Sequence, residues 1–161
     1  MKILVVSDTH RNFFALKQII DENKDDCDMV IHLGDGESEF EKVRALYPEL
    51  GMVYVVGNCD YGKHEDSHIV MTPGGIKIFC CHGHRYGVRQ GVELLAETAR
   101  KNGCSAALYG HTHLFRSEFV SGVLVMNPGS PSEPRGGNKP TYGILTIEGD
   151  GVLKPEIIEL T

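Results

Sequence analysis

The sequence predicts an α/β fold in which two mixed β-sheets pack face to face and helices cover both outer sides, a four-layer α-β-β-α sandwich. The first third of the 161-residue chain alternates buried strands with amphipathic helices, which is the pattern of a parallel sheet. The rest of the chain is richer in antiparallel hairpins. No repeat, linker or low-complexity tract divides the chain, so we expect one domain over residues 1–161.

Five elements alternate in the first third of the chain. They are a strand at 2–8, a helix at 12–23, a strand at 28–35, a helix at 37–47 and a strand at 51–58. The strands are continuous apolar runs with β-branched residues, as expected for strands buried on both faces. From Phe13 onward the first helix repeats apolar residues on one face, with Asn12 placed to cap it. Pro48 closes the second helix.

The rest of the chain is predicted to form hairpins around one further helix. The hairpins pair 68–72 with 76–83 across Pro73-Gly74-Gly75, 115–120 with 123–127 across Ser121-Gly122, and 141–149 with 152–160 across Gly149-Asp150-Gly151. A helix is expected at 88–103, with Gly103 as its C-terminal stop, and a short strand begins at 104. The segment 127–140, rich in Pro, Gly and Ser, is expected to be an irregular loop.

Composition narrows the class of protein. The formal net charge of −6 offers no general attraction to nucleic acid or to an anionic membrane. No apolar run approaches the roughly 20 residues of a membrane-spanning helix, and the N-terminal apolar run is too short for a signal peptide. The five cysteines are odd in number and form no CxxC pair, which favours reduced thiols. We therefore expect a cytoplasmic protein.

Polar side chains follow the predicted strands at the point where each strand ends. They are Asp8, His10, Asp35, Asn58, Asp60, His82, His84, His111 and His113. Each has an ordinary interpretation when taken alone: an Asp after a strand often caps a helix, and an Asn often serves a turn. In α/β sheets, however, ligands bind outside the carboxyl ends of the strands. Five strand ends that carry these side chains to one edge therefore predict a binding site.

The residue types in this set favour metal chemistry. Imidazoles, carboxylates and one amide oxygen bind borderline first-row ions such as Mn, Fe, Zn, Co or Ni. Seven such donors exceed what one ion needs if substrate is also to bind, so two ions that share a carboxylate fit better. Pairs of ions about 4 Å apart are typical of phosphate-ester hydrolysis.

Five short motifs carry a resemblance to a known family. They are "DTH" at 8–10, "GD" at 34–35, "GNCD" at 57–60, "HGH" at 82–84 and "GHTH" at 110–113. In order and spacing they resemble the calcineurin-like metallophosphoesterases, over nearly the whole chain. The short length and the "NPGS" at 127–130 look most like the small bacterial and archaeal phosphodiesterases of the YfcE and MJ0936 kind.

The resemblance implies a fold, an activity and a set of ligands. The fold is the metallophosphoesterase sandwich, and the activity is hydrolysis of a small phosphodiester by a hydroxide that bridges two metal ions. Manganese is the expected ion, with iron, zinc, nickel or cobalt as alternatives. The first ion would be held by Asp8, His10, Asp35 and His113, and the second by Asp35, Asn58, His82 and His111. Asp35 would bridge the two ions.

Cys59 departs from the pattern of many family members, which carry a histidine between the Asn and the acid. A thiol, with a reference pKa of about 8.5, is a weaker proton donor than an imidazolium at about 6.5. Without a strong acid the enzyme should favour good leaving groups such as aryl esters. A soft metal ligand and a small semi-buried side chain are the other interpretations of Cys59. A covalent nucleophile is disfavoured because the metals already supply hydroxide.

Other residues have weaker assignments. Asp60 is expected to orient the site, and His84 is a substitute proton donor. Arg85 and Tyr86 are candidates for substrate contact, whereas Arg135, in the Pro/Gly loop, is interpreted first as a solvated surface arginine and second as a substrate contact.

A binding protein is the alternative to an enzyme. The small subunit of retromer resembles this fold and acts as a protein-binding scaffold with a degraded metal site. Here every ligand position holds a competent ligand, which favours the enzyme. The sequence leaves the oligomeric state open. The segment 123–127 is interpreted as an apolar edge strand, whose pairing between subunits would give a homodimer or tetramer.

Overall fold

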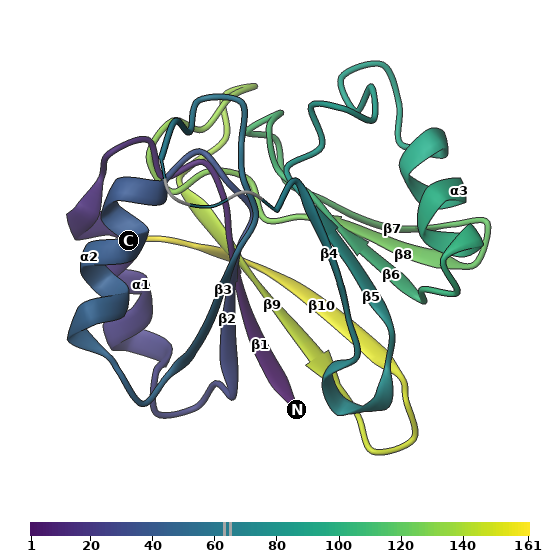
Figure 1. Cartoon of the computed structure of the whole chain (residues 1–161), viewed down its shortest axis with the longest axis horizontal. Helices are drawn as coiled ribbons and strands as arrows, with labels where there is room; N and C mark the ends of the chain where they lie inside the picture. The colour runs from purple at the N-terminus through teal and green to yellow at the C-terminus, as the bar shows by residue number, and fades with distance from the viewer. Residues whose placement is uncertain (63, 65) are drawn as a thin grey trace.

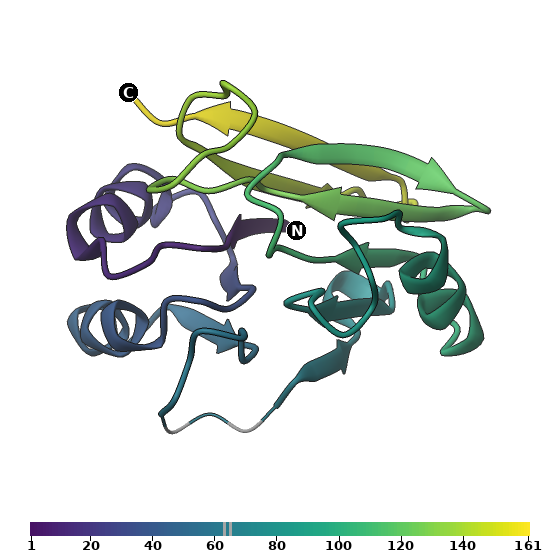
Figure 2. The ribbon, with the colours of Figure 1, turned by 90° about the horizontal axis from the view of Figure 1, so that it is seen from above.

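The computed structural model describes residues 1–62, 64 and 66–161, which form two five-stranded mixed sheets and three α-helices. The sheets lie face to face, with α1 and α2 outside the first sheet and α3 outside the second (Figure 1). Seen from above, the two groups of helices lie at opposite sides of the molecule (Figure 2). This arrangement confirms the predicted four-layer α-β-β-α sandwich.

The first sheet has the strand order β10-β9-β1-β2-β3. Strands β1, β2 and β3 are parallel, as their helical crossovers require, and β9 and β10 are antiparallel additions. The strands are β1 (Lys2–Val6), β2 (Met29–His32), β3 (Gly51–Tyr54), β9 (Thr141–Ile147) and β10 (Leu153–Glu159), and the helices are α1 (Phe13–Asn23) and α2 (Glu37–Leu46).

The second sheet has the strand order β4-β5-β6-β8-β7. The β5, β6 and β8 strands run parallel, while β4 and β7 pair with them antiparallel as hairpins. The elements are β4 (His68–Met71), a short 3-10 helix at Pro73–Gly75, β5 (Ile78–Cys81), α3 (Glu93–Lys101), β6 (Ala106–Leu108), β7 (Arg116–Val120) and β8 (Val123–Asn127).

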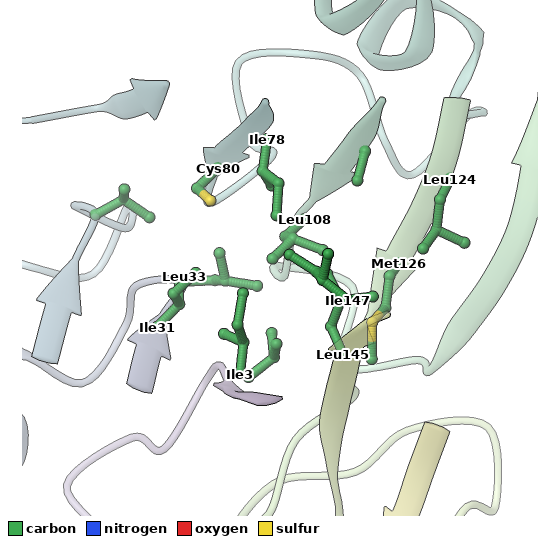
Figure 3. Packing of buried hydrophobic residues seen from close by; sticks show 13 residues of the cluster. Ile3, Ile31, Leu33, Ile78, Cys80, Leu108, Leu124, Met126, Leu145 and Ile147 are labelled. Carbon is green, nitrogen blue, oxygen red and sulfur yellow. The ribbon is translucent and has the colours of Figure 1, made fainter. Parts of the chain in front are cut away.

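The main core fills the space between the two sheets. Ile3 of β1 and Ile31 of β2 meet Ile78 of β5 and Leu108 of β6 there (Figure 3). Alternate residues of β1 point the other way, so that Leu4 packs under the helices α1 and α2. Burial on both faces explains why these strands are continuous apolar runs rather than alternating ones.

Two of the predicted helix-end signals are confirmed, one at the start of α1 and one at the end of α3. The Asn12 side chain accepts a hydrogen bond from the Ala15 amide at 3.0 Å, as predicted for the cap of α1. Gly103 ends α3 with a φ of 72°, where the Cys104 amide reaches back to the Ala99 carbonyl.

The predicted start of the third helix is wrong. Residues 88–92 lie in a chain of turns, and α3 begins at Glu93. Gly87 adopts a φ of 61° in these turns, and the amides of Gln90 and Gly91 are bonded to its carbonyl. Apolar spacing alone does not show such a reversal, because Val88 and Val92 are buried in both arrangements.

The prediction of 123–127 as an edge strand is also wrong. This strand, β8, lies between β6 and β7 and is hydrogen-bonded on both sides. Its five residues are all buried, which accounts for their apolar character without a second subunit. The sheet edges are β10, β3, β4 and β7. Within the described part of the chain, no helix is both long and apolar enough to span a bilayer.

Candidate metal centre

The candidate site lies at the carboxyl ends of parallel strands from both sheets. The strands β1, β2 and β3 of the first sheet and β5 and β6 of the second end on the upper side of Figure 1, where their following loops gather. The fold thereby brings together all seven side chains that the sequence analysis singled out as ligands. They are Asp8, His10, Asp35, Asn58, His82, His111 and His113.

The backbone is strained at this edge. Seven non-glycine residues in the described part of the chain have positive φ, and five of them are candidate ligands: Asp8, His10, Asp35, His111 and His113, with φ between 40° and 69°. Left-handed backbone costs a non-glycine residue on the order of 1–3 kcal/mol and concentrates at functional sites. These turns explain why β1 and β2 end at Val6 and His32, before residues 8 and 35 where the predicted strands ended.

A first donor group forms around Asp8. Its Oδ1 atom lies 3.2 Å from His113 Nε2 and 3.7 Å from His10 Nε2. The two imidazole Nε2 atoms lie 3.1 Å from each other. Asp8 Oδ1 is buried without a hydrogen-bond partner among the described residues, whereas Oδ2 accepts bonds from Ser7 Oγ and the His111 amide. One oxygen thus fixes the carboxylate, and the other is available to a cation.

A second donor group forms around Asn58. The Asn58 Oδ1 atom lies 3.1 Å from His82 Nε2 and 2.9 Å from His111 Nδ1. His82 Nε2 also lies 3.3 Å from Asp35 Oδ2. These four side chains come from loops that follow β2, β3, β5 and β6, so both sheets contribute to the group.

Asp35 lies between the two groups. Its Oδ2 atom is 3.8 Å from His10 Nε2 in the first group and 3.3 Å from His82 Nε2 in the second. Its Oδ1 atom accepts a hydrogen bond from the Cys59 amide at 2.8 Å. A Cβ atom at Gly57 would collide with this carboxylate, which requires glycine there. Asp35 is therefore positioned as a carboxylate that both groups share.

The hydrogen bonds of two histidines test whether these residues fit a metal. His82 Nδ1 lies 2.7 Å from the Leu33 carbonyl oxygen, and His113 Nδ1 lies 2.7 Å from the Glu133 carbonyl oxygen. A carbonyl only accepts, so each Nδ1 carries the hydrogen and the Nε2 lone pair of the neutral ring faces other acceptors. The Nε2 lone pairs and the neighbouring acceptor atoms repel one another unless a cation, either a proton or a metal ion, lies between them. A histidine that binds a metal usually has this orientation, with its other ring nitrogen donating to a carbonyl or carboxylate.

The charges of the residues at the site agree with this interpretation. Burial alone would raise the pKa of Asp8, but the nearby imidazoles of His10, His113 and His82 outweigh burial and hold that pKa far below its usual range. Burial alone would lower the pKa of His82, but the carboxylates of Asp35 and Asp8 outweigh it and raise that pKa. Carboxylates and imidazoles that stabilise each other's charge in this way form a site that exchanges protons for metal ions.

Cys59 is exposed, which corrects the expectation of a semi-buried side chain. It lies on the turn that follows β3, where its neighbours are polar. Its sulfur shares a cluster with donor atoms of His10 and Asp35, all within 4.8 Å of one another. Partial burial and the nearby charge of Asp35 raise the pKa of the Cys59 thiol to about 11. The Cys59 thiol is thus an even weaker acid than its reference pKa indicates. Its distance from the donor atoms of His10 and Asp35 is compatible with the interpretation of Cys59 as a soft metal ligand.

His84 lies beside the donor groups rather than within them. Its ring centroid is 5.4 Å from that of His82 and 6.1 Å from that of His111. Burial, the charge of His82 and the nearby Arg85 lower the pKa of His84. Its Nδ1 atom is buried without a hydrogen-bond partner among the described residues.

The carboxylate of Asp60 accepts five hydrogen bonds, three of them from the turn that carries Asp35. Oδ2 accepts hydrogen bonds at 2.6–2.9 Å and Oδ1 accepts two at 3.2 Å. The donors are the Tyr54 hydroxyl and the backbone amides of Asp35, Gly57, Gly36 and Glu37. With five donors around it, Asp60 is placed to position Asp35 and not to transfer a proton.

Two sets of supporting residues were missed in the sequence analysis. Behind the first motif, Thr9 Oγ1 lies 3.0 Å from His32 Nε2 and donates to the buried carboxylate of Glu39. In the "NPGS" segment, Asn127 donates to the Gly110 carbonyl, and Ser130 Oγ donates to the Asp8 carbonyl at 2.7 Å. Nothing local in the sequence shows which turns these side chains hold, because their partners lie far away along the chain.

Comparison with known proteins identifies the family. The profile of the calcineurin-like phosphoesterase superfamily domain matches residues 1–150. The chain belongs to this superfamily. Among calcineurin-like relatives, a probable metallophosphoesterase of Bacillus subtilis, YsnB, is 34% identical over 93% of this chain and 86% of its own length. Phosphodiesterase MJ0936 of Methanocaldococcus jannaschii is 32% identical over 92% of this chain and 94% of its own.

Solved structures show the same calcineurin-like fold. A predicted phosphoesterase of Streptococcus pneumoniae superposes with a TM-score of 0.84 and 29% identity, over 98% of this chain and 88% of its own. Wild-type Vps29 of Entamoeba histolytica, solved with Zn²⁺, superposes with a TM-score of 0.74 and 25% identity, over 98% of each chain. The structural neighbours therefore include a protein named as a predicted phosphoesterase and a protein named Vps29.

Proposed function

We propose that this member of the superfamily is a metal-dependent phosphodiesterase with two divalent ions, manganese first among them and iron, zinc, nickel or cobalt as alternatives. Asp8, His10, Asp35 and His113 would hold the first ion, and Asp35, Asn58, His82 and His111 the second. The observation that carries this proposal is the position of Asp35, with one oxygen within 3.8 Å of a histidine nitrogen of each group. Two ions supply Lewis acidity toward phosphoryl oxygens and an activated water.

The chain's own residues have defined tasks in this scheme. The Leu33 and Glu133 carbonyls hold the ring hydrogen on Nδ1, which leaves the inward-facing Nε2 atoms of His82 and His113 to bind an ion. Asp60 holds the turn of Asp35, and Ser130 holds the turn of Asp8. Rigid support of this kind keeps the reacting groups correctly oriented, and correct orientation lowers the activation free energy.

We also propose that poor proton donation sets the choice of leaving group. Changing Cys59 to His should raise the rate for a dialkyl phosphodiester relative to bis(p-nitrophenyl) phosphate by at least about tenfold, because imidazole adds a general acid. The measurement is the ratio of kcat values for the two substrates. Cys59→Ser is the matched control, since it keeps the size without adding an imidazole. An unchanged ratio in the His variant contradicts the general-acid argument.

Removal and return of metal test the function itself. Protein stripped with a chelator should show no turnover of bis(p-nitrophenyl) phosphate, and added Mn²⁺ should restore it. Metal analysis should find about two ions per chain when loaded, as a shared-carboxylate site predicts. Zinc, iron, nickel and cobalt, tested in parallel, rank the alternatives. A single ion per chain at saturation would remove the dinuclear part of the proposal.

A protein-binding scaffold on the same fold is the second candidate. The Vps29 neighbour carries Zn²⁺ in its crystal structure, so metal binding by itself does not separate the two functions. Turnover separates them: full metal loading without hydrolysis of any phosphodiester favours the scaffold. A cytoplasmic location, one domain over residues 1–161 and a homo-oligomeric state remain proposals.

A further inference from the structure

A second hollow adjoins the candidate metal centre and is not part of it. Its volume is about 480 Å³, in the range of small-molecule pockets. We call it the arginine groove. Its lining includes Arg89, Arg116, Arg135, Thr112, Leu114 and Phe115. Thr112 is the residue between His111 and His113, so the groove begins on the loop that supplies two candidate ligands.

The groove and the hollow at the metal centre differ in charge. The metal-centre hollow, of about 570 Å³, has a single arginine, Arg11, and five carboxylates among its described lining residues: Asp35, Glu37, Glu39, Asp60 and Glu133. The described lining of the arginine groove holds three arginines and no carboxylate, although the chain as a whole has a net charge of −6. A concentration of positive charge in a concave surface attracts anions.

Two of the three arginines that line the groove make no ion pair with the described part of the chain. Arg116 contacts Glu118 on its own strand, β7. Arg89 and Arg135 are exposed and have no carboxylate within ion-pair distance in the described part of the chain. Guanidinium groups bind phosphate through two parallel hydrogen bonds, which makes arginine the preferred residue for phosphate recognition.

The groove and the candidate metal centre share one loop, since Thr112 lines the groove and its two neighbours are candidate ligands. The Arg135 amide donates to the His113 carbonyl at 3.3 Å. Arg89 lies close enough to His111 for its charge to act on that imidazole. Leu114 and Phe115, 42% and 45% exposed, give the groove an apolar side against which a base or sugar can pack.

We propose that the arginine groove binds a second phosphate group of the substrate, so that the preferred substrates are nucleotide-like phosphodiesters that carry another phosphate beside the scissile one. The identity of the substrate rests on the proposed function, but anion binding by Arg89 and Arg135 does not. The two can therefore be tested separately.

Binding to the metal-free protein tests the groove alone. Thymidine 3′,5′-bisphosphate should bind to the stripped protein by calorimetry at low salt, and thymidine should not. The double change Arg89→Gln and Arg135→Gln should weaken this binding by at least about tenfold, as loss of charged hydrogen bonds predicts. The matched control changes Arg44 and Arg100, two exposed arginines of α2 and α3, to Gln. Equal binding by both double variants, or none by the unmodified protein, overturns the proposal.

Turnover by the manganese-loaded protein tests the link to the substrate. Thymidine 3′-phosphate 5′-(p-nitrophenyl phosphate) should have a kcat/KM at least about tenfold above that of the analogue with a free 3′-hydroxyl. The ratio should fall to near one in the Arg89 and Arg135 double variant. Equal kcat/KM values for the two compounds contradict the proposal. Binding of the bisphosphate without turnover of either compound contradicts the proposed function and leaves the anion site standing.

Discussion

Replacing Asp35 by Asn is expected to lower kcat/KM for bis(p-nitrophenyl) phosphate by at least about a thousandfold. In the proposed hydrolysis, the metal centre is the main source of stabilisation for the charge that develops in the transition state. Asp35 is the carboxylate that lies between the two donor groups. The amide keeps the shape and still accepts from the Cys59 amide, but it removes a negative charge from both groups at once. Steady-state kinetics and metal analysis on the same samples measure the effect.

The control for this change is Asp25→Asn. The Asp25 side chain is 89% exposed and pairs with Lys24 at the surface, so the change should leave both metal content and rate unchanged. If the Asp35→Asn variant retains two ions and loses less than about tenfold in rate, Asp35 is not the shared ligand. A tenfold loss in rate corresponds to only about 1.4 kcal/mol of transition-state stabilisation.

Replacing Asp60 by Ala is expected to lower the free energy of unfolding of the metal-free protein by about 2–4 kcal/mol, since it leaves several donors without an acceptor. The carboxylate accepts five hydrogen bonds, three of them from the backbone of the turn formed by residues 35–37. Metal affinity should fall about 10- to 100-fold because the ligand turn loses its support. Urea unfolding and Mn²⁺ titration measure the two effects.

Two further variants separate positioning from a general loss of stability. Asp28→Ala removes a carboxylate that accepts a hydrogen bond from the Lys2 amide at 2.6 Å, away from the site, and should leave metal affinity unchanged. Asp60→Asn retains an acceptor oxygen and should recover part of the affinity. If Asp60→Ala binds Mn²⁺ as tightly as the unmodified protein, Asp60 does not position Asp35.

Much of the fold could be predicted because its signals are local. The apolar runs of β1 and β2 and the amphipathic helix between them define a parallel crossover unit with few alternatives. The same logic placed Asp8 and Asp35 at one sheet edge, since parallel strands end on the same side. Where a local signal was ambiguous, as at Val88 and Val92, the prediction of helix was wrong.

The sequence by itself determined the layered α/β architecture and the seven polar side chains at the strand ends, because both follow from the periodicity and direction of the strands. The motif resemblance implied how the donors group, and the tertiary structure supplied the distances that put Asp35 between the two groups. The tertiary structure alone decided that β8 is internal rather than an edge. It also decided that Arg89, Arg116 and Arg135 line one groove. These facts depend on contacts between residues far apart in the chain, and such contacts are fixed by the packing of two sheets rather than by any local pattern.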